Sequence, residues 1–445
     1  MKESEIYNKN RNYLRFIRGL VVIGLLVFGI SSCNFPNLGN IFPSNSETEV
    51  PGAAAVSPTP TPSATPDIPV VQSRRLILWV PPQFDPDAAT TAGNLFLSRL
   101  DDFVERRPQT EIQVRVKPIT GDFGILESLQ VTDSAAPIIM PDLVALPRTL
   151  VEQAFEAGLI LPLDGLTESA LDDDLYSYAL ELAQVDDEIA GIPFAGDLMI
   201  LAYKDDTGDM PPPDWDAVIS AQKTMAFPAS DPRGLVPLAH YQSITGVLPG
   251  SGEAPVIQEE ALLDVFTYFQ EAQIASVMPY WLIQFETDEQ AWMSYQDRQS
   301  TMAITWSSIL LTEDSANTSL AAMPTKEAKP FSYADGWVWC VIPSNSETEQ
   351  EAVELIEFLT ESDYLNTWGI EAGYLPVHQA GLENWSETSF YTTLQQLLPA
   401  AVLLPGNDLL EDIGPDIRDA VISVLKDQVE PAAALSILLE DIQGP

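Results

Sequence analysis

Aromatic and acidic side chains at the ends of predicted strands are the residues of this chain best suited to bind a small solute. Three tryptophans hold such positions, Trp79, Trp306 and Trp337, and so does Asp142; Asp197 is the second candidate aspartate. Sugar rings have apolar faces and hydroxyl edges, so the sites that bind them combine aromatic platforms with polar groups. A carboxylate can accept paired hydrogen bonds from sugar hydroxyls. The alternatives are core packing for the tryptophans and a capping role for Asp142.

Three further residues complete the predicted ligand-binding set: Tyr203, Arg233 and Tyr241. Arg233 lies in the sequence Asp-Pro-Arg-Gly, where its guanidinium could pair with an acidic group of a ligand. The alternative is a solvated charge in a loop.

Catalytic and metal-binding patterns are absent from the sequence. There is no GxSxG, HExxH, Walker A or GxGxxG motif. The two histidines, His240 and His378, are too few for most triads or metal sites, and two distant cysteines, Cys33 and Cys340, cannot form a zinc cluster or a disulfide framework. We expect no cofactor, no metal and no enzyme activity. A secreted glycoside hydrolase that uses a carboxylate pair remains the alternative, since the chain has 65 acidic residues.

The elements that must position these residues follow an α/β pattern. Residues 76–80 form a continuous apolar run, typical of a strand buried on both faces. Residues 94–107 carry apolar side chains at helical spacing, and residues 112–117 alternate as in a half-buried strand. This order predicts a βαβ unit in a largely parallel sheet. Ser346 and Glu349 predict a capping box at the start of a later helix.

Composition limits the classes of partner. The 445 residues carry a formal net charge of −44, with 21 basic and 65 acidic side chains. Binding to the phosphate backbone requires clustered Lys and Arg, so nucleic acid is not expected as a partner. Hydrophobic residues make up 46% of the chain, enough for a large core.

The first 32 residues have the layout of a secretory signal. Basic residues precede an uncharged apolar run, residues 20–30, that is shorter than the roughly 20 residues of a membrane span. The run leads into Ile-Ser-Ser-Cys, which resembles the bacterial lipobox. We therefore predict a lipoprotein signal peptide over residues 1–32 and lipidation of Cys33, which would tether the chain to the outer face of a membrane. Residues 33–73 alternate Pro with Ser and Thr in part and predict a semi-stiff tether.

The order of segments from residue 74 onward resembles the family 1 extracellular solute-binding proteins, the class that includes maltose-binding protein. The resemblance is carried by RLILWV at residues 75–80, PDLV at 141–144 with AGLILPLD at 157–164, the stretch from GIPF at 191 to PDWD at 213–216, and EA at 351–352 with GYLP at 373–376. The chain departs from the family at residue 204, where Lys replaces the usual Asn, and at residues 298–303, which read RQSTMA.

This resemblance implies an α/β, two-lobe, periplasmic-binding-protein-like fold with a ligand cleft between the lobes. Lobe 1 would comprise residues 74–193 plus 336–377, and lobe 2 residues 194–335 plus 378–445. It also implies that Asp197 and Trp337 lie at lobe crossings and that Trp306 is a cleft aromatic. The implied function is capture of a small solute for the membrane subunits of an ABC importer, and the aromatic residues lead us to expect a sugar or oligosaccharide as this solute.

Overall fold

The computed structural model describes residues 74–121, 123–167, 173–204, 210–246, 248, 257–313 and 317–443. The predicted signal peptide, Cys33 and the tether lie outside these residues. All of the described residues fall within one compact unit. The strands, in chain order, are β1 (Arg74–Val80), β2 (Thr110–Val116), β3 (Leu143–Pro147), β4 (Gln184–Val185), β5 (Glu188–Ile189), β6 (Ile192–Lys204), β7 (Met225–Ala226), β8 (Met302–Trp306), β9 (Thr318–Ala321), β10 (Ser332–Val341) and β11 (Ala401–Leu403).

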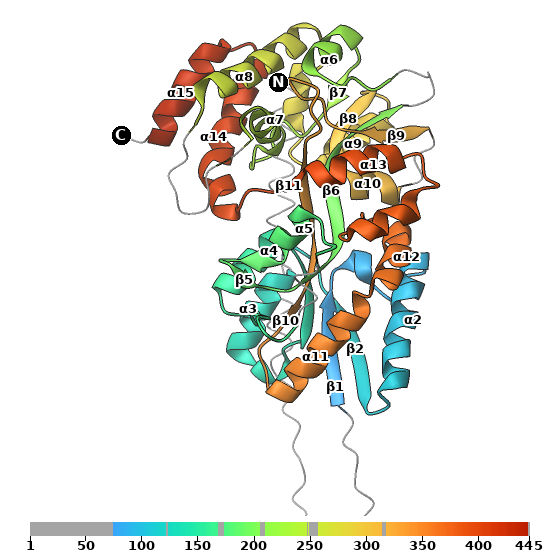
Figure 1. The fold of residues 1–445 in the computed structure, drawn as a ribbon. Coiled ribbons are helices and arrows are strands. Elements are labelled where there is room, and N and C mark those ends of the chain that lie inside the picture. The colour runs from blue at the N-terminus through green and yellow to red at the C-terminus, as the bar shows by residue number, and fades with distance from the viewer. Residues whose placement is uncertain are drawn as a thin grey trace, which may run out of the picture. The chain divides into compact units, whose positions relative to one another are not determined.

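Helices surround these strands (Figure 1). In chain order they are α2 (Thr91–Arg106), α3 (Ile125–Ala135), α4 (Arg148–Glu156), α5 (Ser177–Leu182), α6 (Trp215–Ala221), α7 (Leu235–Thr245), α8 (Glu259–Ile274), α9 (Asp288–Gln296), α10 (Ser307–Thr312), α11 (Ser346–Leu359), α12 (Ser362–Ala372), α13 (Tyr391–Leu397), α14 (Asn407–Leu425) and α15 (Pro431–Gln443). Short 3-10 turns include η1 (Pro82–Phe84), η2 (Pro137–Ile139), η4 (Tyr280–Gln284), η5 (Gln379–Trp385) and η6 (Leu398–Ala400).

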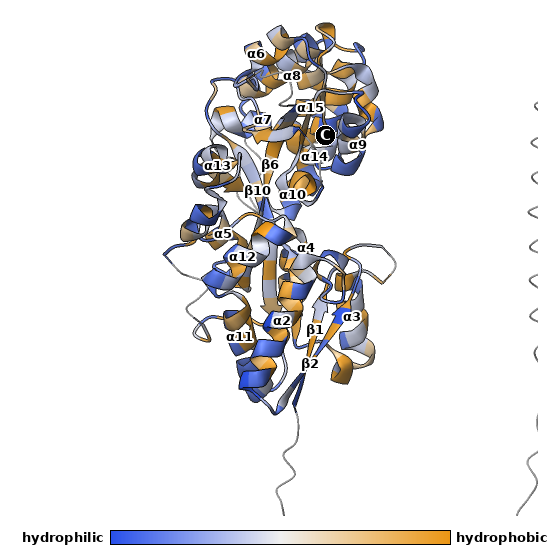
Figure 2. Ribbon diagram, turned by 90° about the vertical axis from the view of Figure 1, so that its right-hand side faces the viewer, coloured by the Kyte–Doolittle hydropathy of each residue, from blue (hydrophilic) through white to orange (hydrophobic). Residues whose placement is uncertain are grey.

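The predicted βαβ unit is confirmed. Strands β1 and β2 pair in parallel, with α2 as the connection between them. The alternate side chains of β1 enter different cores, as expected of a strand buried on both faces: Leu76, Leu78 and Val80 pack in the main cluster, and Trp79 packs in a second cluster on the other side. Figure 2 shows the contrast between the largely hydrophobic β6 and the hydrophilic residues on α2.

Two long strands connect the two ends of the large sheet, whose order is β2-β1-β3-β10-β6-β8-β7. β10 pairs antiparallel with β3 through residues 337–341 and with β6 through residues 334–339. β6 continues beyond β10 and pairs antiparallel with β8 and β9. The chain thus passes from the β1–β3 end to the β7–β9 end along β6 and returns along β10.

Two smaller predictions are settled by the described residues. Helix α11 begins at Ser346, but its capping residue is Asn345, whose side chain accepts a hydrogen bond from the Thr348 backbone N–H, so the predicted capping box of Ser346 and Glu349 is wrong. Glu349 instead accepts from the N–H of Ser344, the residue before the cap, at 2.8 Å. Cys340 is fully buried, as expected of a small apolar residue.

Candidate functional site

The candidate site lies where β6 and β10 run side by side, and we call it the crossing region. It is defined by Asp197 on β6, Asp335 and Trp337 on β10, Trp306 at the end of β8, and by Arg233, Asp288, Ser307, Ser308 and Tyr374, which converge on these strands. Asp197 and Asp335 are direct cross-strand partners, so two carboxylates meet at one point of the sheet.

Asp197 is held by the first residues of α10. Its Oδ1 accepts from the Ser307 hydroxyl at 2.6 Å and from the Ser308 N–H at 2.9 Å, and its Oδ2 accepts from the Ser308 hydroxyl. Burial raises the pKa of Asp197 to about 6, although the three hydrogen bonds oppose the rise. The same causes act at Asp335, where burial raises the pKa while the Gly336 N–H and the charge of Arg233 lower it.

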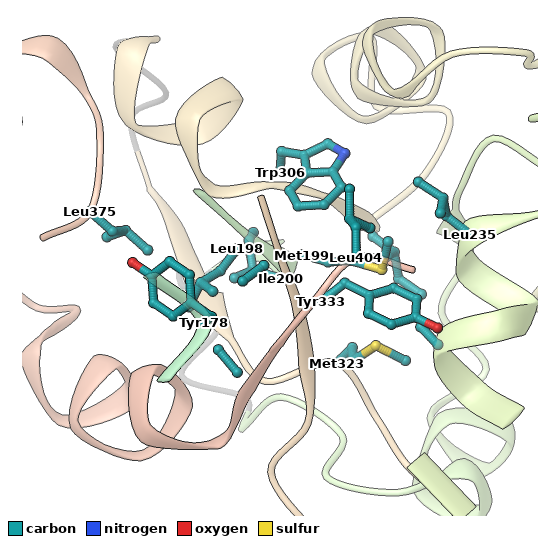
Figure 3. Packing of buried hydrophobic residues seen from close by; sticks show 14 of the residues in the cluster. Tyr178, Leu198, Met199, Ile200, Leu235, Trp306, Met323, Tyr333, Leu375 and Leu404 are labelled. Atoms are coloured by element: carbon teal, nitrogen blue, oxygen red, sulfur yellow. The ribbon is translucent and has the colours of Figure 1, made fainter. Parts of the chain in front are cut away.

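Trp306 marks the edge of the apolar core beside this site. Its side chain is 9% exposed, and its indole N–H donates to Asp288 Oδ2 at 3.1 Å. Figure 3 shows the indole nitrogen on the side of the ring away from Met199 and Leu198. The ring thus joins an apolar surface to a polar group, the combination predicted for a sugar platform.

Arg233 supplies the positive charge of the crossing region. It follows a turn in which Asp231 Oδ1 accepts from the Arg233 N–H at 3.1 Å and lies 3.3 Å from its Nε. The Arg233 side chain is 39% exposed, and its charge acts on both Asp288 and Asp335. A guanidinium placed between two carboxyls can orient a polar ligand without being buried itself.

On the β10 side of the region, Trp337 packs with other aromatic rings in the main core, as its core-packing alternative predicts. The rings of Trp337 and Phe84 meet edge to face with centroids 4.9 Å apart, and Phe84 lies 5.5 Å from Tyr374. Gln83 and Trp337 lie within hydrogen-bonding reach of the Tyr374 hydroxyl. Burial, together with the nearby charge of Asp197, raises the pKa of Tyr374, so this hydroxyl stays protonated and can donate.

Four of the eight predicted ligand-binding residues therefore converge: Asp197, Arg233, Trp306 and Trp337. The other four lie elsewhere. Trp79 is buried in the second core cluster, with the Lys117 ammonium 4.6 Å from its ring centroid. Asp142 Oδ2 accepts from the Ile77 N–H at 2.7 Å, so its side chain bonds to the backbone of β1 and is neither a helix cap nor a turn cap.

Tyr203 and Tyr241 are also remote from the crossing region. Tyr203 is six residues beyond Asp197 on β6, about 20 Å along the strand, and lines a separate cavity of about 700 Å³ with Lys204 and Arg298. Tyr241 is buried in α7, and its hydroxyl accepts from the Gln258 N–H at 2.9 Å. As ligand contacts, all four residues stay predictions; the geometry does not favour Trp79, Asp142 or Tyr241, whereas Tyr203 lines a cavity of its own.

Sequence reasoning missed Asp288, Asp335, Ser307, Ser308 and Tyr374. Tyr374 lies in the Gly-Tyr-Leu-Pro stretch that carried part of the family resemblance, so that stretch could have indicated it. Asp335 stands two residues before the predicted Trp337 and could have been found from the same strand end. The two serines and Asp288 lie beside polar groups that are distant in the sequence, and no local pattern marks them.

Replacing Asp288 with Asn is expected to change how stability depends on pH. Burial, with the charge of Asp231 adding to it, raises the pKa of Asp288 from 3.8 to about 7, whereas the charge of Arg233 lowers it. The folded state thus holds this proton more tightly than the unfolded chain. The contribution to stability is complete below pH 3.8 and is lost as the pH rises toward 7. D288N should remove this loss and gain up to a few kcal/mol relative to wild type between about pH 4 and about pH 8.

Urea unfolding of both proteins across this pH range measures the effect. Glu286→Gln is the matched control, because Glu286 is exposed, lies two residues before Asp288 and is not among the charges that shift the pKa of Asp288. It should leave the pH profile of wild type unchanged. Parallel profiles for wild type and D288N would contradict the raised pKa of Asp288.

The described residues contain neither a group of metal ligands nor a membrane-spanning helix. Within the ranges described above, no three His, Cys, Asp or Glu side chains are grouped so that they could hold a metal ion. Among the same residues, no helix has the length and apolar character needed to cross a membrane.

Comparison with solved structures identifies the fold. Maltose-bound MalE3 of T. maritima is similar with a TM-score of 0.65 and 18% identity, over 83% of this chain and 99% of that one. The cyclic alpha-maltosyl-1,6-maltose binding protein of Arthrobacter globiformis gives a TM-score of 0.69 and 15% identity, over 83% and 97%. An ABC transporter solute-binding protein of Thermotoga lettingae, bound to alpha-D-tagatose, gives 0.62 and 19%, over 83% and 99%. The predicted two-lobe α/β fold is confirmed.

The family follows from the sequence itself. No curated protein matches the chain. The profile of the bacterial extracellular solute-binding proteins, however, matches residues 100–387, well over half of the 445 residues. The chain therefore belongs to the bacterial extracellular solute-binding proteins.

Proposed function

We propose that this solute-binding protein captures a sugar or oligosaccharide at the crossing region and delivers it to the membrane subunits of an ABC importer. The observation that carries the proposal is the convergence of Asp197 on β6, Trp337 on β10, Trp306 on β8 and Arg233 from the turn before α7. Aromatic faces suit the apolar faces of sugar rings, and the carboxyls and the guanidinium suit hydroxyl edges. The similar structures bound to maltose and to tagatose agree with this ligand class.

The alternative of a glycoside hydrolase gains no support from the family match. That reaction needs two carboxyls with separate acid and base or nucleophile roles. In the crossing region, Asp197 is already engaged by three donors from Ser307 and Ser308, and Asp335 accepts from the Gly336 N–H at 2.7 Å. Such carboxyls are arranged to accept hydrogen bonds.

The lobe boundaries remain a proposal, with residues 74–193 plus 336–377 in lobe 1 and residues 194–335 plus 378–445 in lobe 2. They are supported by the pairing of β6, whose first part pairs with β10 and whose last part pairs with β8 and β9. Closure of the lobes around the solute would change the surface presented to the importer, which lets the importer distinguish loaded from empty protein.

Anchoring at the outer face of the cytoplasmic membrane through a lipid on Cys33 also remains a proposal. It rests on the basic and apolar leader and on the Ser-Ser-Cys sequence that ends it. Membrane fractionation of cells that express wild type or Cys33→Ala tests it: the wild type should sediment with membranes and the variant should not. Equal distribution of the two proteins would remove the anchor from the proposal.

A thermal-shift screen tests the ligand class. The purified protein is heated with mono- and oligosaccharides, amino acids, polyamines or phosphates. A ligand at 100 times its Kd should add about 2.7 kcal/mol of stability, because it binds only the folded state. A shift with one class of sugar supports the proposal. A shift confined to a charged non-sugar ligand would leave a solute-binding protein but overturn the sugar assignment.

A further inference from the structure

A cavity separate from the crossing region lies at the other end of β6. Its volume is about 700 Å³, within the range typical of sites for small ligands. Tyr203, near the end of β6, lines it together with Met302 at the start of β8. These two residues are direct cross-strand partners, and Met302 pairs in turn with Met225 of β7. The cavity therefore lies at the ends of three neighbouring strands.

Positive charge is concentrated around this cavity. Three basic residues line it: Lys204, Lys223 and Arg298. None of the described residues that line it is acidic, although acidic residues outnumber basic ones by 65 to 21 in the whole chain. A chain with a net charge of −44 repels anions, so a local group of three cations creates a place where an anion is attracted instead.

The ends of the strands hold these cations near one another. Lys204 is the last residue of β6, and its Nζ donates to Thr318 Oγ1 at 3.2 Å. Lys223 precedes Thr224, whose carbonyl accepts from the Thr301 N–H at 2.9 Å, just before β8 begins. Adjacent strands lie roughly 4.8 Å apart, so the ends of β6, β8 and β7 span about 10 Å, the scale of a small polyvalent anion.

Arg298 adopts a backbone conformation that favours glycine. Its φ is 58°, in the left-handed region, where the Cβ of any other residue is crowded. The side chain is exposed, and its guanidinium has no ion pair or hydrogen bond with the residues that the structure describes. A guanidinium binds the oxygens of carboxylate and phosphate groups in pairs. The charge of Arg298 is therefore available to a ligand in the cavity.

A buried hydroxyl belongs to the same cavity wall. Ser300 is 2% exposed and lines the cavity. Its Oγ has no hydrogen-bond partner in the described part of the chain. A buried hydroxyl without a partner costs free energy, and an oxyanion that accepts its hydrogen bond removes that cost. Arg298 and Ser300 thus both favour a ligand that carries negatively charged oxygens.

We propose that this cavity binds a small oxyanion with two or more negative charges, carried by carboxylate or phosphate groups. Arg298 and Ser300 contact its oxygens, the two lysines add positive charge, and the apolar residues of α6 that line the cavity leave room for a short carbon skeleton. Binding here is independent of solute capture, because Tyr203 and Asp197 are about 20 Å apart along β6.

Titration calorimetry of the purified protein at constant ionic strength tests the proposal. The probes are citrate, succinate, inorganic phosphate and glucose 6-phosphate, with acetate as the monovalent comparison. At least one multivalent probe should bind more tightly than acetate, and its affinity should fall as salt is added. Arg298→Gly should raise its Kd by about tenfold or more, because a charge-assisted pair of hydrogen bonds is lost. Glycine adopts a φ of 58° freely, so this variant keeps the fold.

Arg75→Gln is the matched control for net charge. Arg75 is exposed at the start of β1, which β3 and β10 separate from β6 in the sheet, so this variant should leave the Kd unchanged. Ser300→Ala should raise the Kd by about threefold, since one hydrogen bond to the anion is lost.

Three results would overturn the anion site: equal Kd values for wild type and Arg298→Gly, equal weakening by Arg75→Gln, or no binding of any multivalent probe. Loss of sugar binding in Arg298→Gly would also overturn it, because the cavity would then belong to the capture site. A wild type that binds an anion in this way but no sugar would support the anion site and overturn the proposed function.

Discussion

Replacing Gly336 with alanine is expected to lower the free energy of unfolding by about 3 kcal/mol. Gly336 lies on β10 where this strand pairs with Gly196 on β6. A Cβ at position 336 would lie 2.4 Å from the Ala195 carbonyl oxygen and 2.6 Å from Leu182 Cδ2. The carbonyl belongs to the backbone of β6, so the two strands would have to separate to admit one methyl group. Urea unfolding followed by circular dichroism measures the loss.

Gly406→Ala is the matched control for this prediction. Gly406 precedes α14, and the nearest atom to its added Cβ is Glu152 Oε1 at 3.6 Å, an ordinary contact. The expected cost is about 1 kcal/mol or less, which reflects the poorer capping by alanine. If the two variants lose equal stability, β6 and β10 can shift apart at little cost, and the close strand approach does not constrain the crossing region.

The local elements of this fold could be predicted because their signals are local. The apolar run at residues 76–80 lies within β1, and the helical spacing at residues 94–107 and the alternation at residues 112–117 each extend one residue beyond α2 and β2. The hydrophobic effect acts on these patterns in the same way in any α/β sheet. The predicted capping residue of α11 was wrong by one position. Asn345 and Ser346 are both good capping residues, and only the backbone geometry selects Asn345.

The candidate site could be predicted only in part, because strand ends are visible in the sequence and strand neighbours are not. Trp306 was predicted at a strand end and does end β8, whereas Trp337, predicted in the same way, lies in the middle of β10. Trp79 satisfied the same rule, but its side of β1 faces the second core cluster. Asp288 could not be found in this way, since its role depends on Trp306 and Arg233, 18 and 55 residues away in the sequence. Such long-range neighbours are set by the order of strands in the sheet.

Replacing Trp306 with alanine is expected to raise the Kd for the bound sugar by about 30-fold or more, the effect of removing a central aromatic contact. The variant loses the ring face and leaves Asp288 without the indole N–H that it accepts at 3.1 Å. Trp306→Phe separates the two contributions, because it keeps an apolar face and removes the donor. If the ring face dominates, the phenylalanine variant should bind within about tenfold of wild type.

Tyr241→Phe provides the control for the effect of Trp306, since both residues belong to the predicted ligand-binding set. Its hydroxyl is a buried acceptor for the Gln258 N–H, away from the crossing region. Loss of this bond should cost about 1 kcal/mol of stability and leave the sugar affinity unchanged. Calorimetry and urea unfolding on the same three variants therefore separate affinity from stability. Weak binding by the tyrosine variant together with normal binding by Trp306→Ala would place the sugar near α7 and would remove the crossing region as the site of capture.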